Sequence, residues 1–276
     1  MTAIVSARGL TKRYGRTLAV DHIDLEIPPG RIVVLIGTNG AGKTSALKAI
    51  LWLATYDGEL SVLVKDPARQ RAALMEDVCF IADVAVLPRW IRVHQLIEVT
   101  ERLHPGFSRA RCMDYLSRTK VTPEQKVKQL SKGMVAQLHL AVVMAIDARL
   151  LVLDEPTLGL DILYRKQFYT SLLNDYFDEE RTILITTHQV EEVEHILTDL
   201  IFIRDGKIAL EATMEAVEQQ YTELMVKPDR AAEARALKPM FERELFGRHI
   251  FLYDNVSREQ LAGLGELHTP SVADLF

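Results

Sequence analysis

The spacing of apolar residues divides the chain into expected strands and helices. The runs RIVVLIG, RLLVLDEP and RTILITTH are almost continuously apolar, which is typical of strands buried on both faces. Between Val84 and Ile146, apolar residues recur instead at three- and four-residue spacing, which predicts a helical subdomain. Because strands and helices alternate around these segments, the chain is expected to have an α/β fold with a mainly parallel sheet.

Three further regions complete the predicted architecture. Residues 4–30 alternate strand-type stretches with turn residues, which predicts a small antiparallel sheet. The patterns YRKQFYTSLLNDYF and VEEVEHIL predict helices between later strands, and Asp205-Gly206 marks a hairpin. Mixed patterns near the C-terminus carry no chemical motif and predict a small α/β extension. The predicted division is one large domain at residues 1–214, its helical subdomain at 84–146, and an extension at 215–276.

Composition and charge narrow the class of protein. The 276 residues are 48% hydrophobic and 26% charged, as in globular proteins, and the formal net charge of −5 without a basic block argues against nucleic-acid binding. Cys79 and Cys112 lack the spacing of a disulfide framework or zinc site, which favours a reducing cytoplasm. No signal-peptide pattern and no apolar run of about eighteen residues occurs, so a membrane role would require a partner.

The stretch GTNGAGKT has the pattern of a phosphate-binding loop between a buried strand and a helix. Glycines let backbone N–H groups surround phosphate oxygens, and the helix N-terminus adds a favourable dipole. Lys43 would reach the terminal phosphates, and Thr44 would offer its hydroxyl to Mg²⁺. A glycine-rich turn with an incidental lysine is the alternative. The predicted nucleotide-binding residues here are Gly37, Thr38, Asn39, Gly40, Ala41, Gly42, Lys43, Thr44 and Ser45.

Polar residues at the ends of two other predicted strands would meet at the same sheet edge. Asp154 would hold Mg²⁺ through water, and Glu155 would orient or deprotonate the attacking water. His188 would bond the γ-phosphate and hold that water, and Tyr14 would stack on adenine. Taken singly, these residues also suit an acidic turn, a strand-end histidine and a packed tyrosine.

The order of the motifs resembles that of the ATP-binding cassette (ABC) family. That family carries an aromatic loop, Walker A, Q-loop, LSGGQ signature, Walker B, D-loop and H-loop in sequence. The corresponding stretches here, between about residues 3 and 214, are Tyr14, GTNGAGKT, FIAD, LSKGM, LLVLDE, GLD and His188. The resemblance implies a P-loop NTPase fold that binds and hydrolyses ATP with Mg²⁺.

The resemblance also implies that LSKGM acts on a second subunit. In this family the signature closes on the nucleotide of another cassette, here an identical copy or a paralogue, with the identical copy favoured. Ser131 is a good helix N-cap, and the predicted contacts to the partner's ATP are Ser131, Lys132, Gly133 and Met134. Asp161, in the D-loop, would bridge the two subunits. A plain capped helix is the alternative for this stretch alone.

Two departures from the family pattern affect the expected function. Lys132 and Met134 replace the usual Gly and Gln of the signature, and lysine here is similar to the bacterial YtrB-like branch that exports drugs, antibiotics or lipids. Asp83 replaces the Q-loop glutamine. It is shorter and anionic and could contact Mg²⁺ directly or through water, and weaker or retuned coupling, not lost hydrolysis, is expected.

The resemblance therefore implies the ATPase subunit of a bacterial exporter, in which ATP closes a head-to-tail dimer and hydrolysis with product release reopens it. The subunit would be cytoplasmic and peripheral on the inner face of the cell membrane, bound to a transmembrane permease. The segment VLPRWIRVHQL would form part of the permease groove or an ordinary packing surface. Alternatives are a soluble ABC ATPase without a permease, a regulatory module with little turnover, and an importer subunit. The extension would support dimerisation.

Overall fold

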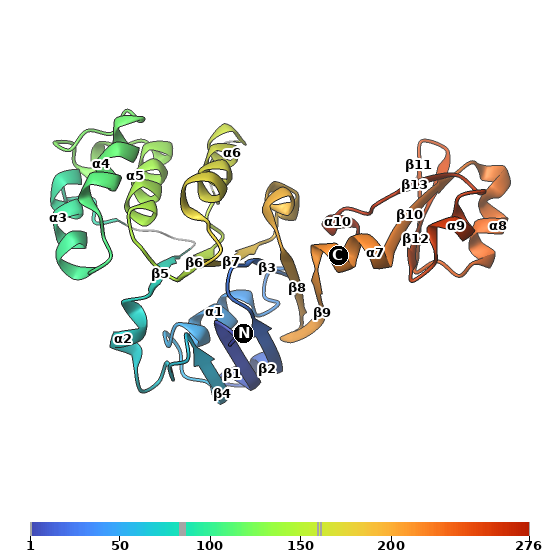
Figure 1. Ribbon diagram of the computed structural model, residues 1–276, viewed down its shortest axis with the longest axis horizontal. Coiled ribbons are helices and arrows are strands. Elements are labelled where there is room, and N and C mark those ends of the chain that lie inside the picture. Colours follow the sequence, from blue (N-terminus) through green and yellow to red (C-terminus); the bar gives the residue numbers. More distant parts are fainter. Residues whose placement is uncertain (1, 83–86, 159, 161, 276) are drawn as a thin grey trace. The chain divides into compact units, whose positions relative to one another are not determined.

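The computed structural model describes residues 2–82, 87–158, 160 and 162–275. These residues form two compact units, one comprising Met1–Leu197 with Ile201–Leu210, the other Thr198–Leu200 with Glu211–Phe276 (Figure 1). No helix among the residues described has the length and apolar content needed to span a bilayer. The assignment of residues 1–214 to a nucleotide-binding domain stays a prediction.

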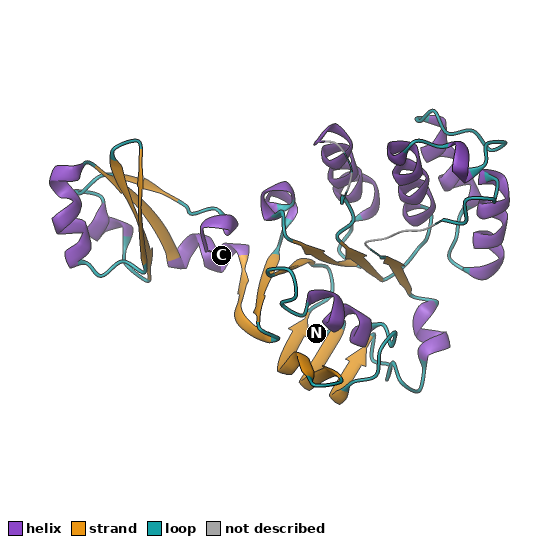
Figure 2. Ribbon diagram, turned by 180° about the vertical axis from the view of Figure 1, so that it is seen from behind, coloured by secondary structure: helices purple, strands orange, loops and turns teal. Residues whose placement is uncertain are grey.

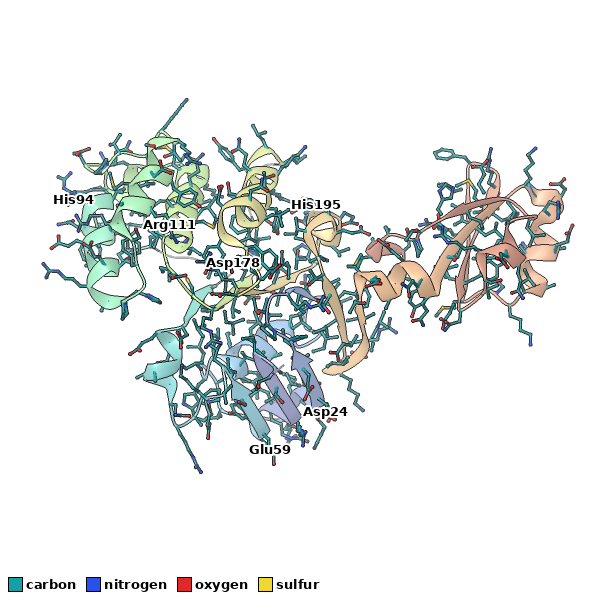
Figure 3. The ribbon with its side chains drawn as sticks, in the orientation of Figure 1. Asp24, Glu59, His94, Arg111, Asp178 and His195 are labelled. Atoms are coloured by element: carbon teal, nitrogen blue, oxygen red, sulfur yellow. The ribbon has the colours of Figure 1, made fainter. Side chains whose placement is uncertain are left out.

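The first unit opens with the expected antiparallel sheet. Strands β1 (Val5–Tyr14), β2 (Thr17–Ile27) and β4 (Asp57–Val62) form it in the order β2-β1-β4. Alternate residues of β2 are buried against α1 (Lys43–Ile50), while Asp24 and Glu59 project from the opposite side (Figure 3). The third strand comes from DGELSV, which the sequence pattern did not single out.

The central sheet brings the ends of four parallel strands to one edge. Its order is β5-β6-β7-β3-β8-β9, and β5, β6, β7 and β3 run parallel. Asp154 pairs in register with Thr186, and Ile36 pairs with Thr187. The strands are β5 (Val78–Ile81), β6 (Leu150–Asp154), β7 (Thr182–Thr187), β3 (Ile32–Ile36), β8 (Asp199–Arg204) and β9 (Lys207–Thr213).

Helices cover both faces of this sheet. On one side lies the predicted helical subdomain together with α6, and on the other lie α1 and the three-stranded sheet (Figure 2). Sequence elements between the strands are α2 (Arg71–Met75), α3 (Val93–Leu103), α4 (Arg109–Ser117), η1 (Val127–Gln129), α5 (Lys132–Met144), α6 (Ile162–Ser171) and η2 (Leu172–Tyr176). The helix predicted at YRKQFYTSLLNDYF is α-helical only as far as Ser171 and then continues as a π-helical turn.

The helix predicted at VEEVEHIL is not an α-helix. The segment forms two 3₁₀ turns, η3 (Val190–Glu192) and η4 (Glu194–Ile196). Val190, Val193 and Ile196 are all buried, and their spacing of three residues aligns them on one face of a helix with three residues per turn. The same spacing suits one face of an α-helix, which is why the sequence pattern misled.

The second unit is the predicted small α/β extension. Its antiparallel sheet has the order β11-β12-β10-β13, and Leu224, Phe251 and Tyr253 pack with Ala234 and Leu261 in its core. The elements are α7 (Met214–Gln220), β10 (Tyr221–Val226), η5 (Pro228–Arg230), α8 (Ala231–Ala236), β11 (Phe241–Leu245), β12 (Arg248–Asp254), α9 (Arg258–Leu261), β13 (Glu266–His268) and α10 (Val272–Leu275).

Candidate nucleotide site

The phosphate-loop sequence runs from the end of β3 into α1, as predicted. A Cβ atom on Gly37 would lie 2.5 Å from the carbonyl oxygen of Ile203. Gly42 has φ +113°, and a Cβ there would lie 2.3 Å from the carbonyl oxygen of Ala19. Both positions therefore require glycine, because the backbone passes too close to neighbouring strands for any side chain.

Lys43 points back into the loop rather than to solvent. Its Nζ donates to the carbonyl oxygens of Gly37 at 2.6 Å and Thr38 at 3.4 Å, and lies 3.9 Å from Oε1 of Glu155. Only 6% of Lys43 is exposed, and burial lowers the pKa of its ammonium, while Glu155 and Asp154 oppose that shift. The loop thus encloses a cation of the kind that binds phosphate.

Asp154, at the end of β6, accepts two hydroxyl hydrogen bonds. Its Oδ1 accepts from Oγ1 of Thr44 at 3.2 Å and from Oγ1 of Thr186 at 2.5 Å, and the residue is 3% exposed. Thr186 was not among the predicted site residues. The paired threonines just before His188, polar residues at the end of an apolar run, were the available signal.

The oxygen atoms of Thr44 and Asp154 fit a magnesium ion. Mg²⁺ is commonly bound by one or two carboxylates together with substrate phosphates, and it does not need a protein cage. In the described part of the chain, no group of three or more His, Cys, Asp and Glu side chains is suited to hold a metal.

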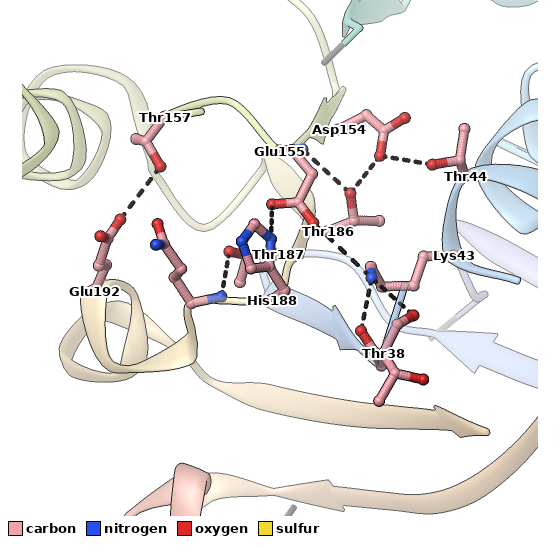
Figure 4. A network of polar contacts seen from close by, with 12 residues as sticks. Thr38, Lys43, Thr44, Asp154, Glu155, Thr157, Thr186, Thr187, His188 and Glu192 are labelled. Carbon is pink, nitrogen blue, oxygen red and sulfur yellow. Dashed lines mark hydrogen bonds and ion pairs between the residues drawn. The ribbon is translucent and has the colours of Figure 1, made fainter. Parts of the chain in front are cut away.

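Glu155 joins the end of β6 to the end of β7. Its φ of +48° is unusual for a residue with a side chain, and its N–H donates to the carbonyl oxygen of Thr186 at 3.0 Å. Its Oε2 lies 2.9 Å from Nδ1 of His188 (Figure 4). The side chain of Glu155 is 14% exposed and that of His188 is 38% exposed, so the carboxylate is sheltered and the imidazole faces outward.

The structure therefore brings together Lys43, Thr44, Asp154, Glu155 and His188 (Figure 4). The signature stretch lies elsewhere, at the N-terminus of α5. There Oγ of Ser131 accepts from the N–H of Met134 at 3.3 Å, as expected of an N-cap, and a Cβ on Gly133 would lie 3.2 Å from the ring of Tyr164. Ser131 and Lys132 are exposed.

Tyr14 is the last residue of β1, and 46% of its surface is exposed. The ammonium of Lys12 lies 4.8 Å from the centre of its ring, an arrangement typical of a cation–π contact. The predicted Q-loop residue Asp83 and the predicted D-loop residue Asp161 lie outside the described residues.

Comparison with known proteins identifies the family. The family model described as ABC transporter matches residues 20–158, half of the chain. The chain belongs to the ABC transporter family. It is an ATPase of that family, and the family and enzyme class predicted from the motif order are confirmed.

Curated relatives match most or all of this ABC protein. A Nod factor export ATP-binding protein I from Cupriavidus metallidurans is 32% identical, with 100% of this chain and 97% of that relative covered. The lantibiotic transport ATP-binding protein SrtF from Streptococcus pyogenes is 29% identical over 78% of this chain and 93% of its own. The ABC transporter ATP-binding protein YtrB from Bacillus subtilis is 23% identical over 82% of this chain and 77% of its own.

Solved structures confirm the predicted P-loop cassette fold. An ATP-binding subunit of an ABC transporter matches with a TM-score of 0.71 at 21% identity, over 78% of this chain and 92% of that structure. A dimeric cassette bound to ADP and Pi matches with a TM-score of 0.67 at 20% identity, over 76% of this chain and 98% of its own. The roles assigned to individual site residues stay predictions.

Proposed function

We propose that this chain hydrolyses ATP to drive an exporter, and that two cassettes enclose ATP at their interface until hydrolysis and product release separate them. One observation carries the proposal: Lys43, Asp154 and Glu155 converge on one sheet edge, with Nζ of Lys43 3.9 Å from Glu155. This edge of the sheet therefore carries a phosphate-binding cation, a metal-binding carboxylate and a candidate base. Phosphoryl transfer needs mainly such positioning and charge stabilisation.

Each residue of this edge has a proposed role in the reaction. Backbone N–H groups of residues 37–45 bind phosphate oxygens, and Lys43 neutralises the terminal phosphates. Glu155 orients or deprotonates the attacking water, and His188 contacts the γ-phosphate. Tyr14 stacks on adenine, and its large exposed fraction leaves ring surface for that contact.

Magnesium is the proposed metal cofactor. Thr44 and Asp154 would hold Mg²⁺, with phosphate oxygens as further ligands, and Asp83 remains a predicted contributor. The ion would neutralise charge on the β- and γ-phosphates. Thr186 keeps the carboxylate of Asp154 oriented toward Thr44, since both hydroxyls donate to the same oxygen.

The signature stretch is proposed to bind ATP held by a second cassette. Helix α5 places the exposed Ser131 and Lys132 at its N-terminus, where an anion is favoured by the helix dipole and by the lysine charge. Their proposed ligand is the γ-phosphate of the partner's ATP, as the resemblance of LSKGM to the ABC signature implies. A second copy of this chain, contacted also through Asp161, is the proposed partner.

A separate transmembrane permease is the other proposed partner, with this chain bound on the cytoplasmic face of the membrane. The names of the relatives from Cupriavidus and Streptococcus, which refer to Nod factor export and lantibiotic transport, support the exporter class over the importer class. A cavity of about 580 Å³, lined by Arg89, His139 and Leu158 among others, lies beside the predicted groove segment. That cavity is the proposed seat of a permease helix.

The observed contact between Glu155 and His188 favours an ATPase over a regulatory module that only binds nucleotide. Steady-state phosphate release distinguishes the two, because the module would release almost none. The relatives' transporter names argue against a soluble ABC ATPase without a permease.

The solution mass of Glu155→Gln with and without Mg-ATP tests the proposal. Blocked hydrolysis should trap a dimer that forms only with ATP, and Ser131→Arg in the same background should abolish it. Glu191→Gln, a neutralised carboxylate on a neighbouring turn, serves as the control and should remain a monomer. A Glu155→Gln chain that binds ATP and stays a monomer would overturn the self-complementary dimer.

A further inference from the structure

Arg165, on α6, joins two loops that border the candidate site. Its Nε donates to the backbone carbonyl of Leu160 at 2.7 Å, and its Nη1 donates to Oε1 of Gln189 at 2.6 Å. The same Nη1 forms an ion pair with Oε1 of Glu192. In the sequence, Leu160 follows Walker B, whereas Gln189 directly follows His188. One guanidinium therefore holds the backbone of the first loop and two side chains of the second.

Thr157 makes a second link between the same loops. Its Oγ1 donates to Oε2 of Glu192 at 3.3 Å (Figure 4) and lies 3.2 Å from the hydroxyl of Tyr169. Thr157 and Tyr169 are both buried. In the second loop, the N–H of Gln189 donates to Oγ1 of Thr187 at 3.0 Å, which closes the turn around His188. Both carboxylate oxygens of Glu192 are thus engaged.

The ion pair between Arg165 and Glu192 is largely shielded from solvent, so it can fix the position of the loop after β7. The side chain of Arg165 is 20% exposed and that of Glu192 is 24% exposed. Removing one member of a sheltered pair leaves the other charge without compensation, so the loop would have to move to restore it. A guanidinium presents several donors in a rigid plane, and a lysine ammonium does not reproduce that arrangement.

We propose that Arg165 is a positioning residue that keeps His188 in contact with Glu155. The proposal rests on the proposed function, in which His188 and Glu155 act on ATP. Arg165 acts through Gln189 and Glu192, which lie one and four positions after His188. Without it, the turn after β7 is free to shift, whereas the phosphate contacts of Lys43 and the loop before α1 stay in place.

The test is the steady-state ATPase kinetics of Arg165→Met in the full chain with Mg-ATP. A displacement of about 1 Å in a catalytic group costs up to about 100-fold in rate, so kcat should fall by about 10- to 100-fold. KM and nucleotide affinity should change by less than about threefold, because the binding groups are untouched. Lys166→Met removes an exposed charge one residue away and should keep kcat within about twofold of wild type.

Two further variants distinguish the proposed positioning role of Arg165 from a merely structural one. Arg165→Lys preserves the charge and should restore only part of kcat, because it cannot reproduce the planar set of contacts. In a His188→Ala background, Arg165→Met should lower kcat by less than about threefold, since its effect passes through His188. The proposal would be overturned if Arg165→Met lowered kcat by the same factor in the His188→Ala background as in wild type. It would also be overturned if Arg165→Met alone left kcat unchanged.

Folding is monitored by thermal unfolding, and Glu192→Gln provides a second route if Arg165→Met fails to fold. Glu192→Gln keeps the size of the side chain and removes its charge, so a drop in kcat without a comparable change in KM is expected. Unchanged kcat in this variant would contradict the inference. A wild-type chain that binds ATP without hydrolysing it would instead refute the proposed function.

Discussion

Oε2 of Glu155 lies 2.9 Å from Nδ1 of His188, although the two residues are 33 positions apart. Parallel pairing of β6 with β7 makes this contact, because it sets Asp154 beside Thr186 and lets Glu155, the residue after β6, reach across. The positive φ of Glu155 turns its backbone at that point. The contact links a candidate base to a residue that would hold the γ-phosphate.

His188→Ala should therefore lower kcat with little effect on ATP affinity. The imidazole is expected to act on the attacking water and the γ-phosphate, and loss of such a contact typically costs about 100- to 1,000-fold in rate. Phosphate release under saturating Mg-ATP gives kcat, and equilibrium binding of a fluorescent nucleotide gives affinity. His195→Ala, on the nearby turn η4 (Figure 3), is the control and should keep near-normal turnover.

Thr186→Val should weaken the binding of Mg²⁺ at Asp154. Valine has the shape of threonine but cannot donate to Oδ1, so of the two hydroxyl bonds that Asp154 accepts only the one from Thr44 remains. The Mg²⁺ concentration needed for half-maximal ATPase should rise by about tenfold, the effect of losing an orienting partner of a metal ligand. Thr186→Ser retains the hydroxyl and should behave like wild type. Equal Mg²⁺ requirements in the two variants would exclude the proposed role.

The part of the site formed by contiguous residues is predictable from the sequence. GTNGAGKT carries its glycines, lysine and threonine within eight positions, so the loop, its strand and its helix were all predictable. Asp154, Glu155 and His188 were predictable for a related reason, since each follows an apolar strand and parallel strands end at one edge.

Contacts that depend on register or distant packing were missed. The role of Thr186 depends on its pairing with Asp154, and the role of Arg165 on three partners from two loops. Neither is encoded in local spacing. The strand DGELSV was missed likewise, because it forms only by pairing with β1, from which it is separated by about fifty residues along the chain.

Gly42→Ala and Gly40→Ala should differ sharply, although both glycines have positive φ. Gly42 lacks room, since a Cβ would lie 2.3 Å from the carbonyl of Ala19, whereas nothing lies within 4 Å of a Cβ on Gly40. Gly40→Ala should cost about 1 kcal/mol in the free energy of unfolding, as expected from φ alone, and Gly42→Ala should cost more. Denaturant titration gives both values. Equal costs would mean that the loop gives way around Gly42.

His139→Gln should make the chain more resistant to acid. Burial lowers the pKa of His139 to about 4, and the cavity it lines also contains Arg89, Lys128 and Lys132, which offer no negative partner for a protonated imidazole. A folded-state pKa below the ordinary value of 6.5 means that the unfolded chain binds more protons between these two values. Stability is therefore lost as pH falls from about 6.5 toward 4.

Glutamine stays neutral throughout that range, so it removes this loss. At pH 5 the variant should retain on the order of 1–2 kcal/mol of unfolding free energy that wild type loses relative to pH 7. Denaturant unfolding at both pH values measures the difference. His94→Gln, which exchanges an exposed histidine on α3 (Figure 3), is the matched control for the substitution itself. If the unfolding free energies of wild type and His139→Gln fall by the same amount between pH 7 and pH 5, then His139 is protonated in the folded chain without cost.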